Sequence, residues 1–182
     1  YYKNPDATAE TLDADGWLHS GDIGTLDSEG FLSVTDRKKE LIVTSGGKNI
    51  GPAGLEAQLK QIPMLAQAAV IGDRRNYLSA LFVLDPAWIE NHAAGLGSEA
   101  RTLEDSATCP RLRAHLQGEL DKANTRWARY EQIRRFAILP EELTVASGQL
   151  TPTMKLKRRV IHERYATTIE GIYAAGEGAA ER

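Results

Sequence analysis

The chain has 182 residues, of which 42% are apolar and 26% are charged, and its formal net charge is −3. This is the composition of an ordinary globular protein, and the slight acidic balance provides no basic face for nucleic acid. The single cysteine, Cys109, excludes an internal disulfide, and no apolar run approaches the roughly 20 residues that a membrane-spanning helix needs.

The N-terminal part predicts a short helix and a β-hairpin. Asn4 can cap a helix, and Pro5 suits its first turn. Two short strands flank a turn at 27–30, which predicts a hairpin over 22–36. The first residue is Tyr1 and not Met, and the first stretch, YYKNPDATAETL, resembles the interior of a domain more than its start. We therefore expect the chain to be the C-terminal portion of a longer protein.

The rest of the chain mixes strands and helices. The predicted elements are a strand at 40–45, a helix at 52–62, strands at 66–73 and 78–85, a short helix from Pro86, a loop or marginal helix at 93–109, a helix at 110–127, a strand at 133–139, a polar loop at 146–154 and a terminal helix at 155–173. This order predicts a small α+β (mixed α/β) domain with a short β-sheet flanked by helices.

Asp22, Asp36 and Arg37 are the first candidates for binding chemistry. Asp22 follows Ser20 and Gly21, where a carboxylate can accept hydrogen bonds from two adjacent hydroxyls such as those of a ribose. A turn aspartate that satisfies local amides is the simpler alternative. Asp36 and Arg37 join the hairpin to the next strand, which is a natural place for a hinge, and the planar guanidinium of Arg37 suits a phosphate or a ribose.

Gly46, Gly47 and Lys155 are further candidates. Paired glycines allow a ligand or another backbone to approach closely, although a turn or bulge is the simpler explanation, and the spacing is not that of a Walker loop. Lys155 stands among several cations at a loop-to-helix boundary, where the helix dipole disfavours cations unless an anion is nearby. The four histidines show no ligand spacing, so we predict no metal site of the protein's own.

Three stretches in this order resemble the C-terminal part of the AMP-forming acyl-CoA synthetase family, within the adenylate-forming superfamily. They are YYKNPDATAETLDADGWLHSGDIG, GFLSVTDRKKELIVTSGGKNIGPAGLE and LTPTMKLKRR. The last stretch and the long insert before it look most like the long-chain fatty acid branch. Members with smaller substrates usually have glycine where Met154 stands.

The resemblance implies a fatty acid–CoA ligase that works in two steps. ATP and a fatty acid give acyl-AMP, and the thiol of coenzyme A then displaces AMP, with a mobile C-terminal domain rotating between the steps. The large domain of the family, which lies outside this chain, would make most of the contacts with ATP and Mg2+. The matched roles are ribose binding for Asp22, a nucleotide contact for Arg37, the hinge for Asp36, catalysis of adenylation for Lys155, and the coenzyme A face for Gly46, Gly47 and Lys48.

The same resemblance predicts the domain boundaries. Residues 1–36 would be the tail of the large domain with its hairpin and hinge, 37–175 the mobile domain, and 176–182 a disordered tail. We expect the charged hinge residues to remain solvated while the chain pivots, and we expect this fragment to lack ligase activity by itself.

Two other functions remain open from the sequence. One is a fatty-acyl-AMP ligase that loads a carrier protein, and the glycine pair favours coenzyme A over it. The other is a stand-alone interaction module without catalysis. The expected location is the cytoplasm, and peripheral contact with the inner membrane through the acyl substrate is left open.

Overall fold

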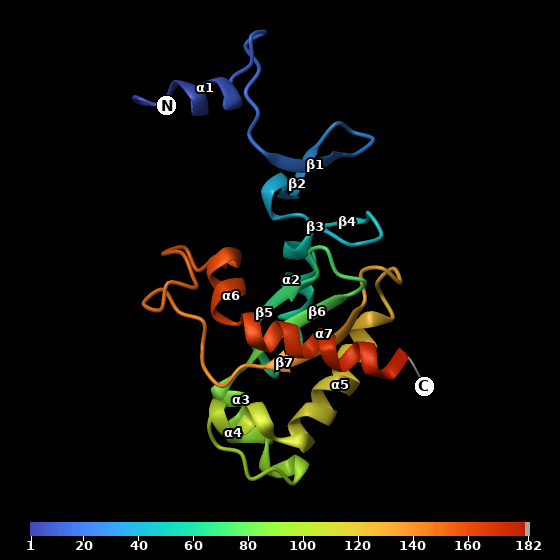
Figure 1. The fold of residues 1–182 in the computed structure, drawn as a ribbon. Helices are drawn as coiled ribbons and strands as arrows, with labels where there is room; N and C mark the ends of the chain where they lie inside the picture. Colours follow the sequence, from blue (N-terminus) through green and yellow to red (C-terminus); the bar gives the residue numbers. More distant parts are fainter. Residues whose placement is uncertain (181–182) are drawn as a thin grey trace.

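The computed structural model describes residues 1–180, with side chains for residues 1–174 (Figure 1). Its elements follow one another in this order: α1 (Pro5–Thr11), β1 (Asp22–Leu26), β2 (Leu32–Arg37), the 3-10 turn η1 (Lys38–Glu40), β3 (Ile42–Val43), β4 (Asn49–Ile50), α2 (Pro52–Leu59), β5 (Leu65–Ile71), β6 (Leu78–Leu84), α3 (Pro86–His92), η2 (Ala94–Leu96), α4 (Leu103–Thr108), α5 (Pro110–Asn124), β7 (Ile133–Ile138), α6 (Arg158–Arg164) and α7 (Ala166–Ala180).

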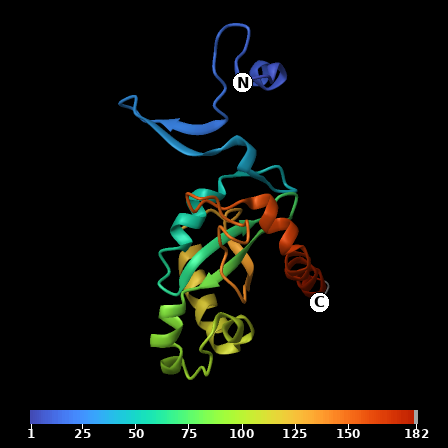
Figure 2. The ribbon, with the colours of Figure 1, turned by 90° about the vertical axis from the view of Figure 1, so that its left-hand side faces the viewer.

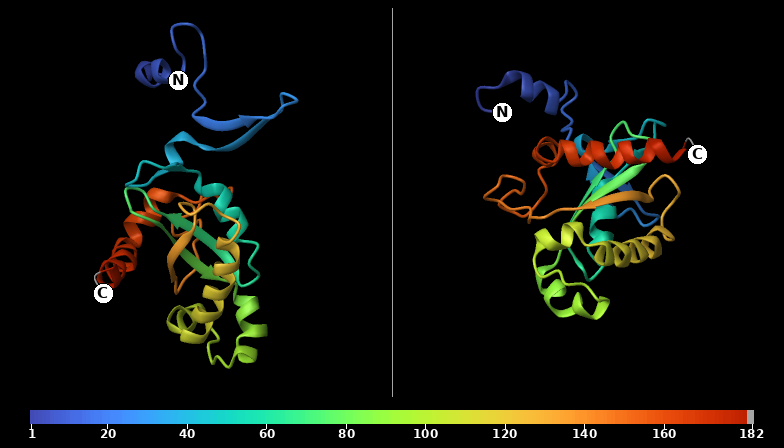
Figure 3. Two further views of the ribbon diagram at one scale, coloured as in Figure 1. Left: turned by 90° about the vertical axis from the view of Figure 1, so that its right-hand side faces the viewer. Right: turned by 60° about the horizontal axis from the view of Figure 1, so that its bottom comes forward.

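A three-stranded sheet in the order β5-β6-β7 forms the centre of the body. Strands β5 and β6 are antiparallel, whereas β6 and β7 are parallel. A parallel return needs a long crossover, and α3, α4 and α5 provide it. Helix α7 lies on one side of the sheet and α5 on the other (Figure 3), so the body has three layers. The predicted α+β fold with a small sheet flanked by helices is confirmed.

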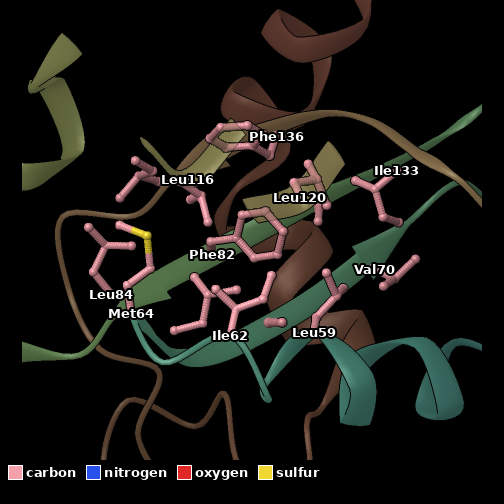
Figure 4. Close-up of a cluster of buried hydrophobic side chains, with 14 of the residues drawn as sticks. Leu59, Ile62, Met64, Val70, Phe82, Leu84, Leu116, Leu120, Ile133 and Phe136 are labelled. Carbon is pink, nitrogen blue, oxygen red and sulfur yellow. The ribbon is translucent and has the colours of Figure 1, made fainter. Parts of the chain in front are cut away.

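The central strand β6 explains how the two cores are built. All seven of its residues are buried. Alternate residues of a strand point to opposite faces, so Phe82 enters the core beneath α2 and α5, while Leu81 and Val83 enter the core beneath α6 and α7. Figure 4 shows the first core, where Phe82 packs near Phe136 with ring centroids 5.4 Å apart.

The segment before β3 stands apart from these cores. Figures 1 and 2 show α1 and the β1–β2 hairpin projecting from one end of the body. No residue before Ile42 belongs to either buried cluster of the described chain. Several large apolar side chains of this segment are exposed, namely Trp17, Leu18, Leu26, Phe31, Leu32 and Val34. Within residues 1–180, no helix has the length and apolar character needed to cross a bilayer.

Three local predictions differ from the structure. The strand predicted at 40–45 is η1 followed by the two-residue strand β3, which pairs with the unpredicted strand β4. The segment at 93–109 contains the regular helix α4, which begins with a capping box formed by Thr102 and Asp105. The terminal helix begins only at Arg158 and is divided at Tyr165. Helix α7 extends through Ala180, and residues 181–182 of the expected tail lie outside the described residues.

Candidate functional site

An open cavity of about 770 Å³ lies between the β1–β2 hairpin, helix α2 and the loop that leads to α6. We call it the hinge cavity; it is lined by residues 22, 34–37, 40, 53, 56, 57, 60, 151, 154–156 and 158. Asp22, Arg37 and Lys155 all reach this cavity, although up to 133 residues separate them in sequence (155 − 22). The structure therefore brings together the three side chains for which the sequence predicts nucleotide chemistry.

Asp22 and Arg37 form one side of the hinge cavity as a pair. They are partners in the β1–β2 register, and the Nε of Arg37 lies 3.0 Å from Oδ1 of Asp22. Gly21 has a positive φ of 76°, a conformation that favours glycine, and its carbonyl accepts a hydrogen bond from the Lys38 amide at 2.8 Å. This hydrogen bond holds together the open end of the hairpin, where Asp22 and Arg37 meet.

Asp36 departs from the expectation of a solvated hinge. Its side chain is buried, with 7% of the residue exposed. Its Oδ1 accepts a hydrogen bond from the Arg37 amide at 2.8 Å, and its Oδ2 accepts a longer one from the Ala53 amide at 3.4 Å. The expectation was wrong for this side chain, because the Arg37 amide and the Ala53 amide at the start of α2 replace water as its donors.

Lys155 comes from a tight turn on the opposite side of the hinge cavity. Thr151 Oγ1 accepts a hydrogen bond from the Lys155 amide at 3.0 Å, and the Lys155 carbonyl accepts one from the Thr151 amide at 2.8 Å. Between them, Met154 has a positive φ of 62°. Among residues 1–174, neither Lys155 nor Lys60, another cation that lines the cavity, takes part in an ion pair. Their positive charge remains available to an anion.

Gly46, Gly47 and Lys48 lie elsewhere, in the turn between β3 and β4. None of them lines the hinge cavity, and Figure 1 shows this turn on the other side of the body from the loop before α6. Gly47 has a positive φ of 74°, and its amide donates to the Thr44 carbonyl at 2.9 Å. The Nζ of Lys48 lies 5.6 Å from the centre of the Tyr130 ring. The structure thus separates the predicted coenzyme A face from the predicted nucleotide face.

A charge network in the wall of the hinge cavity, with a buried pair at its centre, was not predicted from the sequence. The Nη2 of Arg158 donates to Oε2 of Glu56 at 2.7 Å, and Oε1 of Glu56 accepts from the Val70 amide at 2.8 Å. The Nε of Arg158 lies 3.7 Å from Glu40 of η1. Burial raises the pKa of Glu56, and the Arg158 guanidinium opposes that rise. Glu40 is itself exposed, and 118 residues separate it from Arg158 in sequence (158 − 40).

Arg158 and Glu40 also line a second, smaller cavity of about 220 Å³. His162 lies on its wall, where burial, followed by repulsion from Arg158, lowers the pKa of the imidazole. Among the residues that the structure describes, no group of three or more His, Cys, Asp or Glu side chains is placed to hold a metal ion.

Comparison with known proteins assigns this arrangement to a family. The model of the AMP-binding enzyme C-terminal domain matches residues 39–177. The chain belongs to this family. The match begins just after Asp36 and Arg37, at the second residue of η1.

Relatives and solved structures agree with that assignment. The chain is 44% identical over 177 residues to the long-chain-fatty-acid–CoA ligase FadD15 of Mycobacterium tuberculosis, covering 95% of this chain and 29% of the relative. It resembles the adenylation domain of a carboxylate reductase from Mycobacterium chelonae, with TM-score 0.79, 29% identity and coverage of 96% of this chain and 26% of that one.

A second solved structure is the corresponding domain from Segniliparus rugosus, in complex with AMP and a co-purified carboxylic acid. The TM-score is 0.78 at 29% identity, again with 96% and 26% of the two chains covered. The chain therefore spans less than a third of the length of these relatives.

Proposed function

We propose that this chain is the C-terminal part of a long-chain fatty acid–CoA ligase, which forms acyl-AMP from a fatty acid and ATP and then acyl-CoA. The observation that carries the proposal is the convergence of Asp22, Arg37 and Lys155 on the hinge cavity. Membership of the AMP-binding enzyme family supports it, as does the similarity to FadD15. Coenzyme A is preferred over a carrier protein as the acceptor because FadD15 is named a CoA ligase.

The charges of the hinge cavity fit a nucleotide in the following way. The oxygen of Asp22 that Arg37 does not hold can accept hydrogen bonds from ribose hydroxyls, and the exposed guanidinium of Arg37 can face the nucleotide. Lys155, with no ion-pair partner among residues 1–174, would stabilise the negative charge that builds up between the fatty acid carboxylate and the α-phosphate. Mg2+ would arrive with ATP and be held outside this chain.

We further propose that residues 1–36 belong to the large domain and that the body from residue 37 rotates about Asp36. Support comes from the cores, in which no described residue before Ile42 takes part, and from the exposed apolar side chains of the hairpin. Rotation would exchange the face that contains Lys155 for the turn at 46–48. Because the turn lies apart from the hinge cavity, one active site could use each face in a separate step.

The decisive experiment substitutes Lys155 in the full-length ligase. Lys155→Ala should reduce pyrophosphate exchange on the order of 10²–10³-fold, because one preorganised electrostatic contact with the transition state is lost. Single-turnover formation of acyl-CoA from supplied acyl-adenylate should be retained. Lys157→Ala is the matched control, since Lys157 is an exposed lysine of the same loop that does not line the hinge cavity. Normal pyrophosphate exchange in a folded Lys155→Ala enzyme would refute the assignment.

A further inference from the structure

Helix α2 begins without a capping side chain of its own. Gly51 occupies the N-cap position and has no side chain, and Pro52 at the first helical position has no amide proton to donate. The amide of Ala53 is therefore the first free donor of the helix, and it donates to Oδ2 of Asp36 at 3.4 Å. A residue at the end of strand β2, 17 positions earlier, thus performs the capping role.

Gly51 leaves room for that carboxylate. A β-carbon built on Gly51 would lie 3.1 Å from Cγ of Asp36 and nearer still to its Oδ2. The backbone at Gly51 has φ −80° and ψ 108°, which any residue can adopt. Glycine is therefore required here for space and not for conformation. Gly54, three residues later in the same helix, has nothing within 4 Å of a built β-carbon.

The contact between Asp36 and α2 also determines where the nucleotide-binding pair lies. Asp36 pairs with Ile23 in the hairpin register, and the next register pair is Asp22 with Arg37. Fixing Asp36 against α2 therefore places Asp22 and Arg37 over the hinge cavity, across from Lys155. No other buried side chain precedes Ile42 in the described chain, so this contact is the anchor of the hairpin on the body.

We infer that Asp36 and Gly51 are positioning residues that latch the hairpin onto helix α2 in the orientation that forms acyl-AMP. The latch closes when the carboxylate of Asp36 enters the space above Gly51, and it opens when the body rotates and water replaces the Ala53 amide as the partner of that carboxylate. The role in the reaction rests on the proposed function, whereas the latch itself is a property of this chain.

The latch can be measured in the 182-residue chain without any reaction. Spin labels at Ser28 in the hairpin turn and at Ala114 on α5, both exposed, report the orientation of the hairpin once Cys109 is replaced by Ser. The parent chain should give one narrow distance distribution. Loss of an N-cap typically changes an equilibrium roughly two- to thirty-fold, so Gly51→Ala should add a broad second population. Gly54→Ala should match the parent.

A double substitution tests whether the two residues act on each other. Gly51→Ala should have its effect when Asp36 is present and none when Asp36→Ala has already removed the carboxylate. Asp36→Asn, which keeps an acceptor of the same shape, should stay closer to the parent than Asp36→Ala. An unchanged distance distribution in Gly51→Ala would overturn the latch. An effect of Gly51→Ala that is the same with Asp36→Ala would overturn the pairing.

The consequence for the reaction is tested in the full-length ligase. Gly51→Ala should slow pyrophosphate exchange roughly two- to thirty-fold and leave single-turnover acyl-CoA formation unchanged or faster. An equal fall in both steps would overturn the positioning role. If the parent ligase catalyses neither step, the proposed function fails, and the distance measurement on the chain still decides whether the latch exists.

Discussion

Arg158→Met is the substitution whose effect the structure predicts most sharply. Methionine keeps most of the apolar stem but removes the guanidinium that donates to Glu56 at 2.7 Å and to the Val70 carbonyl at 3.3 Å. The two side chains are 18% and 9% exposed, so the pair is largely shielded from water. Breaking a buried pair by removing one partner costs about 3–5 kcal/mol, because the remaining charge is left uncompensated.

The loss should depend on pH, because Glu56 can take up a proton. Burial already raises its pKa above the usual value of 4.5, and Arg158 opposes that rise. Without Arg158 the folded-state pKa rises further. The folded chain then binds the proton more tightly than the unfolded chain does, so the contribution of Glu56 to stability is complete below the unfolded pKa and is lost as pH rises through the folded pKa. We expect the full loss at about pH 8 and a much smaller one at about pH 5.

Guanidinium-induced unfolding of the 182-residue chain at several pH values measures this effect. Arg159→Met is the matched control. Its side chain is 88% exposed, and its ion pair with Glu163, at 3.5 Å, is a surface pair worth about 0–1 kcal/mol. A loss in Arg158→Met that is independent of pH, or no larger than that of Arg159→Met, would show that the network does not bury an ionised carboxylate as the structure indicates.

Two further substitutions test the turns at the two faces. Met154 has a positive φ of 62°, so Met154→Gly should raise the free energy of unfolding by about 1 kcal/mol in a denaturant titration, whereas Met154→Ala should not. If the proposed function holds, Gly47→Leu in the full-length protein should slow acyl-CoA formation from acyl-adenylate and leave pyrophosphate exchange nearly intact. Gly47→Ala, which imposes the same backbone strain at φ 74° without the bulk, controls for conformation.

The main elements were predictable because their signals are local. Asn4 and Pro5 predict the start of α1, and the Asn4 side chain accepts from the Ala7 amide at 3.0 Å as expected. The continuous apolar run at 78–84 predicts a strand buried on both faces, and β6 is such a strand. By contrast, β4 has only two residues, and its pairing with β3 depends on the turn in which Gly47 has a positive φ. Such a short pairing leaves no apolar periodicity in the sequence from which it could be predicted.

The site was predictable only in part, for a related reason. The residue types at Asp22, Arg37 and Lys155 suggested nucleotide chemistry one by one, but their common cavity is a result of tertiary structure. The buried pair of Glu56 and Arg158 was missed because 102 residues separate the two in sequence. Burial of a charge is decided by its partners, and these partners are far apart in sequence.

The burial of Asp36 changes how a hinge of this kind would work. A solvated pivot residue interacts equally with water in every orientation, so it cannot favour one of them. Asp36 interacts with the α2 amide in the observed orientation, and Gly51 makes room for it there. A contact made in one orientation and lost in another has a differential free energy, and only such a difference can shift a conformational equilibrium. The hinge would then be a two-state element whose closed state is set by one carboxylate and one missing side chain.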